Sequence, residues 1–195
     1  MDHSFAEPPA GHGTKARPRP GSCQSVRVGN DHLIRHAEPD DAAALLAIYA
    51  PVVRETAISF EFEPPSASEF AARIERVTAC DPWLVLERSG EIAGYAYAGD
   101  FRSRPAYATT RETTLYVDPA HRRAGVGRAL LSALLAEIDR RGARLAVAVI
   151  ALPNEPSVAL HESLGFIRTG TLHQVARKFD TWYDEGFWEL RFGAD

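Results

Sequence analysis

The sequence predicts an α/β domain in which a mixed, mostly antiparallel sheet of about six to seven strands is flanked by about four helices. Residues 145–151 (LAVAVIA) are uniformly apolar, as expected for a central strand buried on both faces. Residues 109–117 alternate and end at an Asp-Pro turn signal, which indicates a second strand. A long helix is predicted over residues 127–141, because Gly142 marks its end. Strands and helices therefore alternate through the second half of the chain.

Local signals place the elements of the first half. Residues 33–35 form a short first strand, and Pro39 suits the first turn of a helix. Residues 55–65 alternate and then stop at two prolines, which indicates an extended segment and a loop. Ser66 and Glu69 form an S-x-x-E capping box, so a second helix begins there.

A hairpin follows the second helix, with Ser89-Gly90 as its turn. The last predicted helix opens at Asn154 and ends at Gly165. The remaining predicted strands are residues 83–87, 92–98, 166–172 and 187–192. This order of elements predicts helices on both faces of the sheet.

Composition limits the number of domains and the kinds of partner. The chain has 195 residues, of which 45% are hydrophobic, so it can bury a sizeable core. Residues 1–31 are rich in Pro, Gly, Ser, His and Arg and are predicted to be a disordered tail, which leaves residues 32–195 as one domain. The net charge of -4 argues against a nucleic-acid or anionic-membrane partner. Without a CxxC pair or an apolar run near the ~20 residues that span a bilayer, we expect a metal-free cytoplasmic protein.

The most informative stretch joins the strand at residues 109–117 to the next helix and reads Arg-Arg-Ala-Gly-Val-Gly-Arg over residues 122–128. A helix N-terminus has unpaired N–H groups and a partial positive charge, and Gly125 and Gly127 would let an anion approach closely. A Walker loop would need Gly-Lys-Ser/Thr and a Rossmann fingerprint a third glycine, and both are absent here. The sequence therefore predicts a pyrophosphate site. The arginines that add positive charge there are Arg122, Arg123 and Arg128.

This pattern resembles the R/Q-x-x-G-x-G/A signature of the GNAT N-acetyltransferases. The resemblance implies the GNAT fold and acetyl-CoA as co-substrate, with the loop amides on its pyrophosphate. It also implies that the backbone of the preceding strand hydrogen-bonds the pantetheine arm. The implied acetyl-CoA-binding residues are Leu115, Tyr116, Val117, Arg122, Arg123, Ala124, Gly125, Val126, Gly127, Arg128 and Asn154.

Glu112 is the candidate general base of such a reaction. It shares one strand face with Thr114 and Tyr116, because side chains alternate along a strand. A carboxylate in a buried central strand is costly unless it is paired or functional. Acetyl transfer needs a base, because an acceptor ammonium (pKa roughly 9–10) must lose a proton before its nitrogen attacks the thioester. The alternative is a structural glutamate paired with a nearby arginine.

Two residues near the last helix complete the implied site. Asn154 matches a family asparagine that contacts the pantetheine arm, and alternatively it is only the N-cap of the helix. His161 stands where many family members have a tyrosine that protonates the departing thiolate, and its pKa near neutrality suits that role. The alternative for His161 is a helical side chain packed against the sheet.

The resemblance extends to the phosphinothricin and methionine sulfoximine acetyltransferase branch, over about residues 33 to 192. It is carried by residues 112–117 (ETTLYV), 147–158 (VAVIALPNEPSV) and 160–166 (LHESLGF). It implies a homodimer. It also implies a small amino-acid acceptor with an oxygen-rich tetrahedral group on its side chain. Arginines would bind the acidic groups of this acceptor. The candidate acceptor-binding residues are Phe60, Phe62, Arg102, Arg104 and Tyr107.

Other functions stay open at this point. Residues 173–180 depart from the branch pattern near the expected substrate mouth, and the arginine loop could be a solvated turn. A protein N-terminal acetyltransferase would need an open groove, and a polyamine acetyltransferase an acid-lined pocket. A non-catalytic acyl-CoA sensor would keep the phosphate loop and lose the base.

Overall fold

The computed structural model describes residues 26–27 and 32–193. The predicted tail, residues 1–31, lies outside the described residues except for Val26–Arg27, which form the short strand β1. Within the described part of the chain, no helix is both long and apolar enough to cross a membrane.

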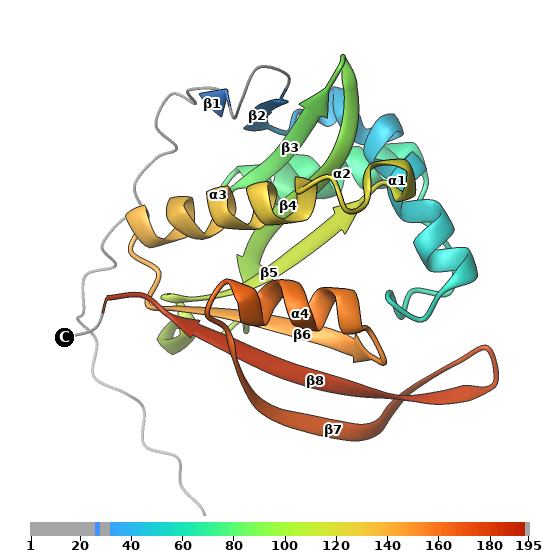
Figure 1. Ribbon diagram of the computed structural model, residues 1–195, viewed down its shortest axis with the longest axis vertical. Helices are drawn as coiled ribbons and strands as arrows, with labels where there is room; N and C mark the ends of the chain where they lie inside the picture. Colours follow the sequence, from blue (N-terminus) through green and yellow to red (C-terminus); the bar gives the residue numbers. More distant parts are fainter. Residues whose placement is uncertain (1–25, 28–31, 194–195) are drawn as a thin grey trace, which may run out of the picture.

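The described strands form one sheet with the order β1-β2-β3-β4-β5-β6-β8-β7 (Figure 1). Neighbouring strands are antiparallel except β5 and β6, which are parallel, so the mixed and mostly antiparallel sheet is confirmed. The seven predicted strands are all present. Their bounds are β2 His32–His36, β3 Trp83–Arg88, β4 Glu91–Asp100, β5 Thr110–Val117, β6 Leu145–Leu152, β7 Ile167–Lys178 and β8 Thr181–Arg191.

Four helices cover the two faces of the sheet (Figure 1). One buried cluster joins α3 to one face of the sheet, with α4 packed at its border, and the other joins α1 and α2 to the opposite face. The α2 helix begins at the predicted capping box, in which the N–H of Glu69 donates to Ser66 Oγ at 3.2 Å. The helices are α1 Ala42–Glu55, α2 Ala67–Thr78, α3 Val126–Arg140 and α4 Glu155–Ser163.

The central strands β5 and β6 are paired along only part of their length. Their register runs from Thr110 opposite Leu145 to Thr113 opposite Ala148. Beyond this point β5 stays paired with β4 and β6 stays paired with β8, so the two strands diverge as a V (Figure 1). The V leaves the β6-facing edge of residues 114–117 without a strand partner in the described sheet.

The β7–β8 hairpin is longer than predicted. Its distal half is mostly exposed and lacks the alternation that marks a half-buried strand, so the sequence pattern did not indicate it. Lys178, at the end of β7, is only 2% exposed. Its Nζ donates to the carbonyl oxygens of Val53 at 2.6 Å, Thr56 at 2.8 Å and Ser59 at 2.6 Å. This one ammonium therefore ties the hairpin to the end of α1 and to the loop that follows.

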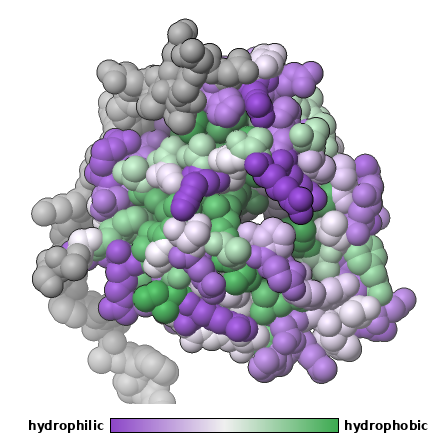
Figure 2. All heavy atoms as spheres, viewed as in Figure 1, coloured by the Kyte–Doolittle hydropathy of each residue, from purple (hydrophilic) through white to green (hydrophobic). Residues whose placement is uncertain are grey.

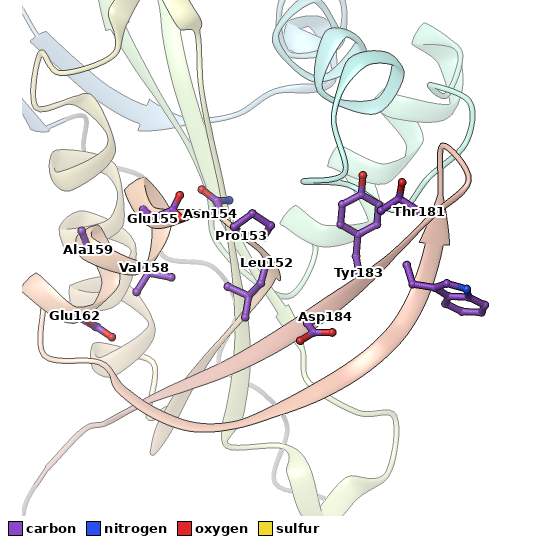
Figure 3. A pocket seen from close by; sticks show the side chains of 11 residues that line it. Leu152, Pro153, Asn154, Glu155, Val158, Ala159, Glu162, Thr181, Tyr183 and Asp184 are labelled. Carbon is purple, nitrogen blue, oxygen red and sulfur yellow. The ribbon is translucent and has the colours of Figure 1, made fainter.

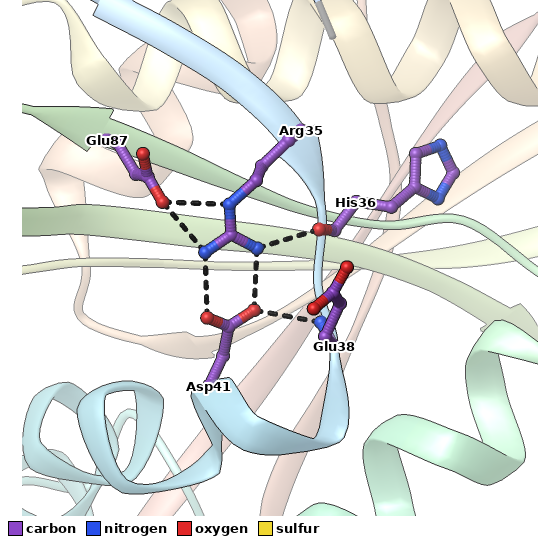
Figure 4. Close-up of polar contacts among 5 residues, drawn as sticks. All are labelled: Arg35, His36, Glu38, Asp41 and Glu87. Carbon is purple, nitrogen blue, oxygen red and sulfur yellow. Dashed lines mark hydrogen bonds and ion pairs between the residues drawn. The ribbon is translucent and has the colours of Figure 1, made fainter. Parts of the chain in front are cut away.

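An ion-pair cluster fixes the corner between β2, β3 and the 3-10 turn at Pro39–Asp41 (Figure 4). The Arg35 guanidinium donates to both Asp41 carboxylate oxygens at 2.7 and 2.8 Å and to Glu87 at 2.8 Å. Burial alone would raise the pKa of the Asp41 carboxyl, but the hydrogen bonds from Arg35 and from the N–H of Glu38 lower it overall.

Candidate active site

The predicted phosphate loop lies where β5 leads into α3. Gly125 is the N-cap of α3 with φ 80°, and Arg123 has φ 60°. The N–H of Ala129 donates to the Gly125 carbonyl at 3.0 Å, which starts the helical hydrogen bonds. In the described part of the chain, no acceptor is found for the backbone N–H groups of residues 123–128. Unpaired donors at a helix N-terminus suit an anion.

The two glycines of this loop have different roles. A side chain at Gly125 would meet open space, so its requirement is the left-handed backbone. A Cβ at Gly127 would lie 3.2 Å from Leu160 Cδ2 and 3.5 Å from Leu115 Cδ2. Gly127 therefore allows α3 to pack closely against α4 and β5. The sequence had indicated only that Gly127 would let an anion approach the helix.

Arginines surround the loop. The side chains of Arg122, Arg123 and Arg128 are exposed, so their charges are available to a ligand. Arg128 also reaches the end of α4, where its Nη2 donates to the Ser163 carbonyl at 3.4 Å. Ala124 and Val126 complete the loop, and Val126 is buried beneath it in the core.

Asn154 is the N-cap of α4, because its Oδ1 accepts from the N–H of Ser157 at 3.3 Å, and the cap leaves its amide nitrogen free of this bond. It also lies on the rim of a cleft of about 720 Å³ between α4 and β8 (Figure 3). Glu155, Glu162 and Asp184 line this cleft, so it does not suit an anionic cofactor. The phosphate loop lies on the other side of α4 (Figure 1). In the space-filling view, which shows the molecule from the same side as Figure 1, hydrophobic side chains gather around a hollow near the middle (Figure 2).

His161 is buried in α4 at 5% exposure. Its Nδ1 lies 2.8 Å from the Ser157 carbonyl oxygen, so Nδ1 carries the hydrogen and donates it. The ring meets Phe166 edge-on at 5.0 Å. Burial lowers the pKa of the imidazole, although the Ser157 carbonyl raises it. The ring is therefore buried and packed against Phe166, and it favours its neutral form.

Glu112 lies at the closed end of the V, opposite Val147 of β6 and Gly99 of β4. It is half-buried and faces the α1–α2 side of the sheet, as does Tyr116, which packs in that core. Burial raises the pKa of the Glu112 carboxyl, the negative charge of Glu185 raises it further, and Arg102 lowers it.

Glu185 is a second carboxylate that the sequence analysis missed. It lies on β8 opposite Ala151 of β6, and burial raises its pKa. The prediction began the last strand at residue 187, so it gave no reason to orient this side chain. Only the register of β8 on β6 places Glu185 beside the V.

The predicted acceptor residues fall into two groups. Arg102 stacks over the Phe101 ring at 5.0 Å, and the Tyr107 ring lies 5.9 Å from the same ring. The Phe60 ring lies 6.4 Å from that of Tyr183 on β8. All four residues other than Phe60 are exposed, Phe62 at 73%, and for Arg104 and Phe62 no ring contact or ion pair is found among the described residues.

Two further features frame the α1–α2 side. A cavity of about 230 Å³ under these helices is lined by Tyr97 and Tyr116 among other residues. Among the residues that the structure describes, no group of three His, Cys, Asp or Glu side chains could hold a metal ion.

The diverging strands β5 and β6 lie beside a helix N-terminus with unpaired N–H groups, an arrangement that can hold an anionic ligand at the central sheet. A family model described as an acetyltransferase (GNAT) domain matches residues 34–187. The chain belongs to the GNAT acetyltransferase family.

Relatives narrow this assignment to one branch. The chain is 42% identical over 159 residues to a phosphinothricin N-acetyltransferase of Streptomyces viridochromogenes, covering 82% of this chain and 87% of that protein. It is 40% identical to an L-methionine sulfoximine/L-methionine sulfone acetyltransferase of Salmonella typhimurium, covering 81% and 93%. A crystal structure of a phosphinothricin acetyltransferase from Sinorhizobium meliloti in complex with acetyl-CoA superposes with a TM-score of 0.81 at 34% identity, covering 84% and 89%.

Proposed function

We propose that the chain transfers an acetyl group from acetyl-CoA to the amino group of a small amino acid of the phosphinothricin, methionine sulfoximine or methionine sulfone class. One observation carries the proposal. The phosphate loop belongs to the α3–α4 side of the sheet and Glu112 faces the α1–α2 side, and the strands between them, β5 and β6, are not paired with each other beyond Thr113 and Ala148. The names of the relatives support the acceptor class.

Acetyl-CoA would enter from the α3–α4 side. The N–H groups of residues 123–128 would hold its pyrophosphate, with Arg122, Arg123 and Arg128 supplying charge. The unpaired edge of β5 at Leu115, Tyr116 and Val117 would hydrogen-bond the pantetheine arm. Asn154 keeps its amide nitrogen for the same arm, because only its oxygen is used in the cap.

The amino acid would enter from the α1–α2 side. Arg102 would hold its α-carboxylate, and Phe60 and Tyr107 would wall the site. Arg104 and Phe62 would contribute only by turning inward from their exposed positions. Glu112 would accept the proton of the acceptor ammonium, directly or through a water. The nitrogen lone pair would then attack the thioester carbonyl to give a tetrahedral intermediate. As the nitrogen loses its second proton, the C–S bond would break and CoA would leave as the thiolate.

The thiolate finally takes up a proton, and His161 is the proposed donor. Its Nδ1–H is held by Ser157, so donation requires a proton on Nε2, and the lowered pKa makes that form less populated at neutral pH. Water is the alternative donor. We also propose that the chain works as a homodimer in the cytoplasm, since the related branch implies pairing and acetyl-CoA is supplied there.

Release of CoA in the presence of single acceptors tests the proposal. We expect methionine sulfone to be acetylated faster than spermidine or an alanine-initiated peptide at equal concentration. Faster acetylation of either of these amines would overturn the acceptor class and leave the acetyl transfer intact. Acetyl-CoA binding without turnover on any acceptor would instead indicate a sensor.

A further inference from the structure

Glu185 places a second carboxylate on the acceptor side of the V. Residues paired across neighbouring strands point to the same face of a sheet, and every second residue of a strand shares that face. Glu112 pairs with Val147, and Ala151, four residues further along β6, pairs with Glu185. Both carboxylates therefore face the α1–α2 side, one at the closed end of the V and one along its β6 side.

The packing around Glu185 supports this orientation. Its neighbours on β8, Gly186 and Trp188, belong to the opposite face, where Trp188 is buried at 1% exposure in the α3–α4 core. A Cβ at Gly186 would collide with the Trp188 ring at 2.4 Å, so this ring covers the strand on that side. Glu185 is half-buried on the acceptor side, and no ion-pair partner for it is found among the described residues.

We propose that Glu185 determines acceptor specificity, favouring amino acids whose side chain carries an N–H donor or a positive charge over those with an anionic side chain. This inference rests on the proposed function. Arg102 can neutralise one negative charge of the acceptor. The α-carboxylate of the acceptor would pair with Arg102, which leaves no cation for a second negative charge. A phosphinate on the side chain would then meet Glu185 and Glu112, and like charges brought together in a half-buried site repel.

The same carboxylate acts on the base. The charged or titratable groups that face Glu112 are Arg102 from the loop after β4, Tyr97 from β4 and Glu185 from β8. Removing the charge of Glu185 lowers the pKa of Glu112. The acid limb of kcat/KM, where Glu112 becomes protonated, then moves to lower pH, and a merely structural glutamate would not produce this shift.

The test compares three acceptors of similar shape with wild type and Glu185→Gln. Methionine sulfoximine has a neutral side chain with an N–H, methionine sulfone a neutral one without it, and phosphinothricin an anionic one. We expect wild-type kcat/KM to fall in that order. In Glu185→Gln we expect kcat/KM for phosphinothricin to rise about tenfold relative to methionine sulfoximine.

Controls separate the possible failures. Glu91→Gln removes the same charge from an exposed position at the start of β4 and should leave the order unchanged. An unchanged acceptor ratio and acid limb in Glu185→Gln would overturn the role of Glu185, as would an equal change in Glu91→Gln. A wild type that acetylates none of the three acceptors would overturn the proposed function itself. Glutamine preserves the size of the side chain, and equal unfolding midpoints verify that the fold is intact.

Discussion

Glu112 is the proposed base of the reaction and His161 the proposed acid. Burial shifts the pKa of each side chain in the direction that favours its neutral form. Burial raises the pKa of the Glu112 carboxyl, which brings it closer to that of the amine it would deprotonate. Burial lowers the pKa of the His161 imidazole, which makes it a poorer acid at neutral pH. The surroundings therefore support the role of Glu112 more directly than that of His161.

Glu112→Gln keeps the shape of the side chain and removes its basicity. Turnover should fall ~10²–10⁴-fold at neutral pH, with little change in the calorimetric affinity for acetyl-CoA. Because the pKa of Glu112 is raised, wild-type kcat/KM should decline as the pH falls through that value, and the variant should lack this limb. A variant that keeps more than about a third of wild-type turnover, a loss under ~1 kcal/mol, would remove Glu112 from the mechanism.

Asp41→Asn should make the free energy of unfolding less dependent on pH in the acidic range. The pKa of Asp41 is lowered from its ordinary value of 3.8, so its charge stabilises the fold above that value and this contribution is lost as the pH falls through the lower, folded-state pKa. At neutral pH we expect unfolding by urea to require ~1–3 kcal/mol less free energy, the worth of hydrogen bonds to charged groups. Asp40→Asn, an exposed neighbour, should change little, and equal losses in both variants would contradict the prediction.

At the scale of helices and strands, the residues that bind or connect lie at the ends of the elements. The start of α3 carries the unpaired N–H groups and the exposed arginines, and the end of β7 carries Lys178. The capping box, the glycine-containing turn before α3 and the last helix could all be predicted from local sequence, because each depends on residues within a few positions. The contact of Lys178 with residues 53–59 could not, because it joins segments more than a hundred residues apart.

Arg122→Gln and Arg128→Gln should weaken acetyl-CoA binding. Each removes an exposed positive charge beside the helix N-terminus, so we expect a roughly 3- to 30-fold loss of affinity that shrinks as salt is added. Isothermal titration calorimetry at two salt concentrations measures it. Arg140→Gln, at the far end of the same helix, is the control, and an effect as large there would count against the loop.

Lys178→Met should loosen the hairpin from α1. Two buried carbonyl oxygens and one partly buried carbonyl oxygen would lose their donor, at a cost of about 2–4 kcal/mol in the free energy of unfolding. Because the same loop carries Phe60, KM for the acceptor should rise while acetyl-CoA affinity stays near that of wild type. Unchanged stability in urea would show that water replaces the ammonium without loss.

Across the whole molecule, the sheet separates two hydrophobic cores, and its central strands β5 and β6 part beyond Thr113 and Ala148. The proposed cofactor and acceptor would therefore approach from opposite directions and meet at Glu112. The edge strand β7 exposes apolar side chains at Ile167, Leu172 and Val175. An exposed edge of this kind is stabilised when another chain covers it.

Sedimentation equilibrium should give a mass twice that of the 21.4 kDa chain. Leu172→Lys should shift the equilibrium toward the monomer, because it places a charge on the exposed edge. Glu91→Lys, far from β7 in the sheet order, should leave the mass unchanged. A monomer at all concentrations in wild type would contradict the proposed homodimer.

The sequence by itself determined the order and type of the elements and the glycine-containing turn before α3, and it singled out Glu112 as the candidate base, because periodicity, caps and glycines act over short distances along the chain. The tertiary structure alone decided where β5 and β6 part, how far the β7–β8 hairpin extends, and that Glu185 faces the same side as Glu112. Those features depend on the register between strands that are distant in sequence. A shift of one residue would turn Glu185 to the other face, and no local pattern fixes that register.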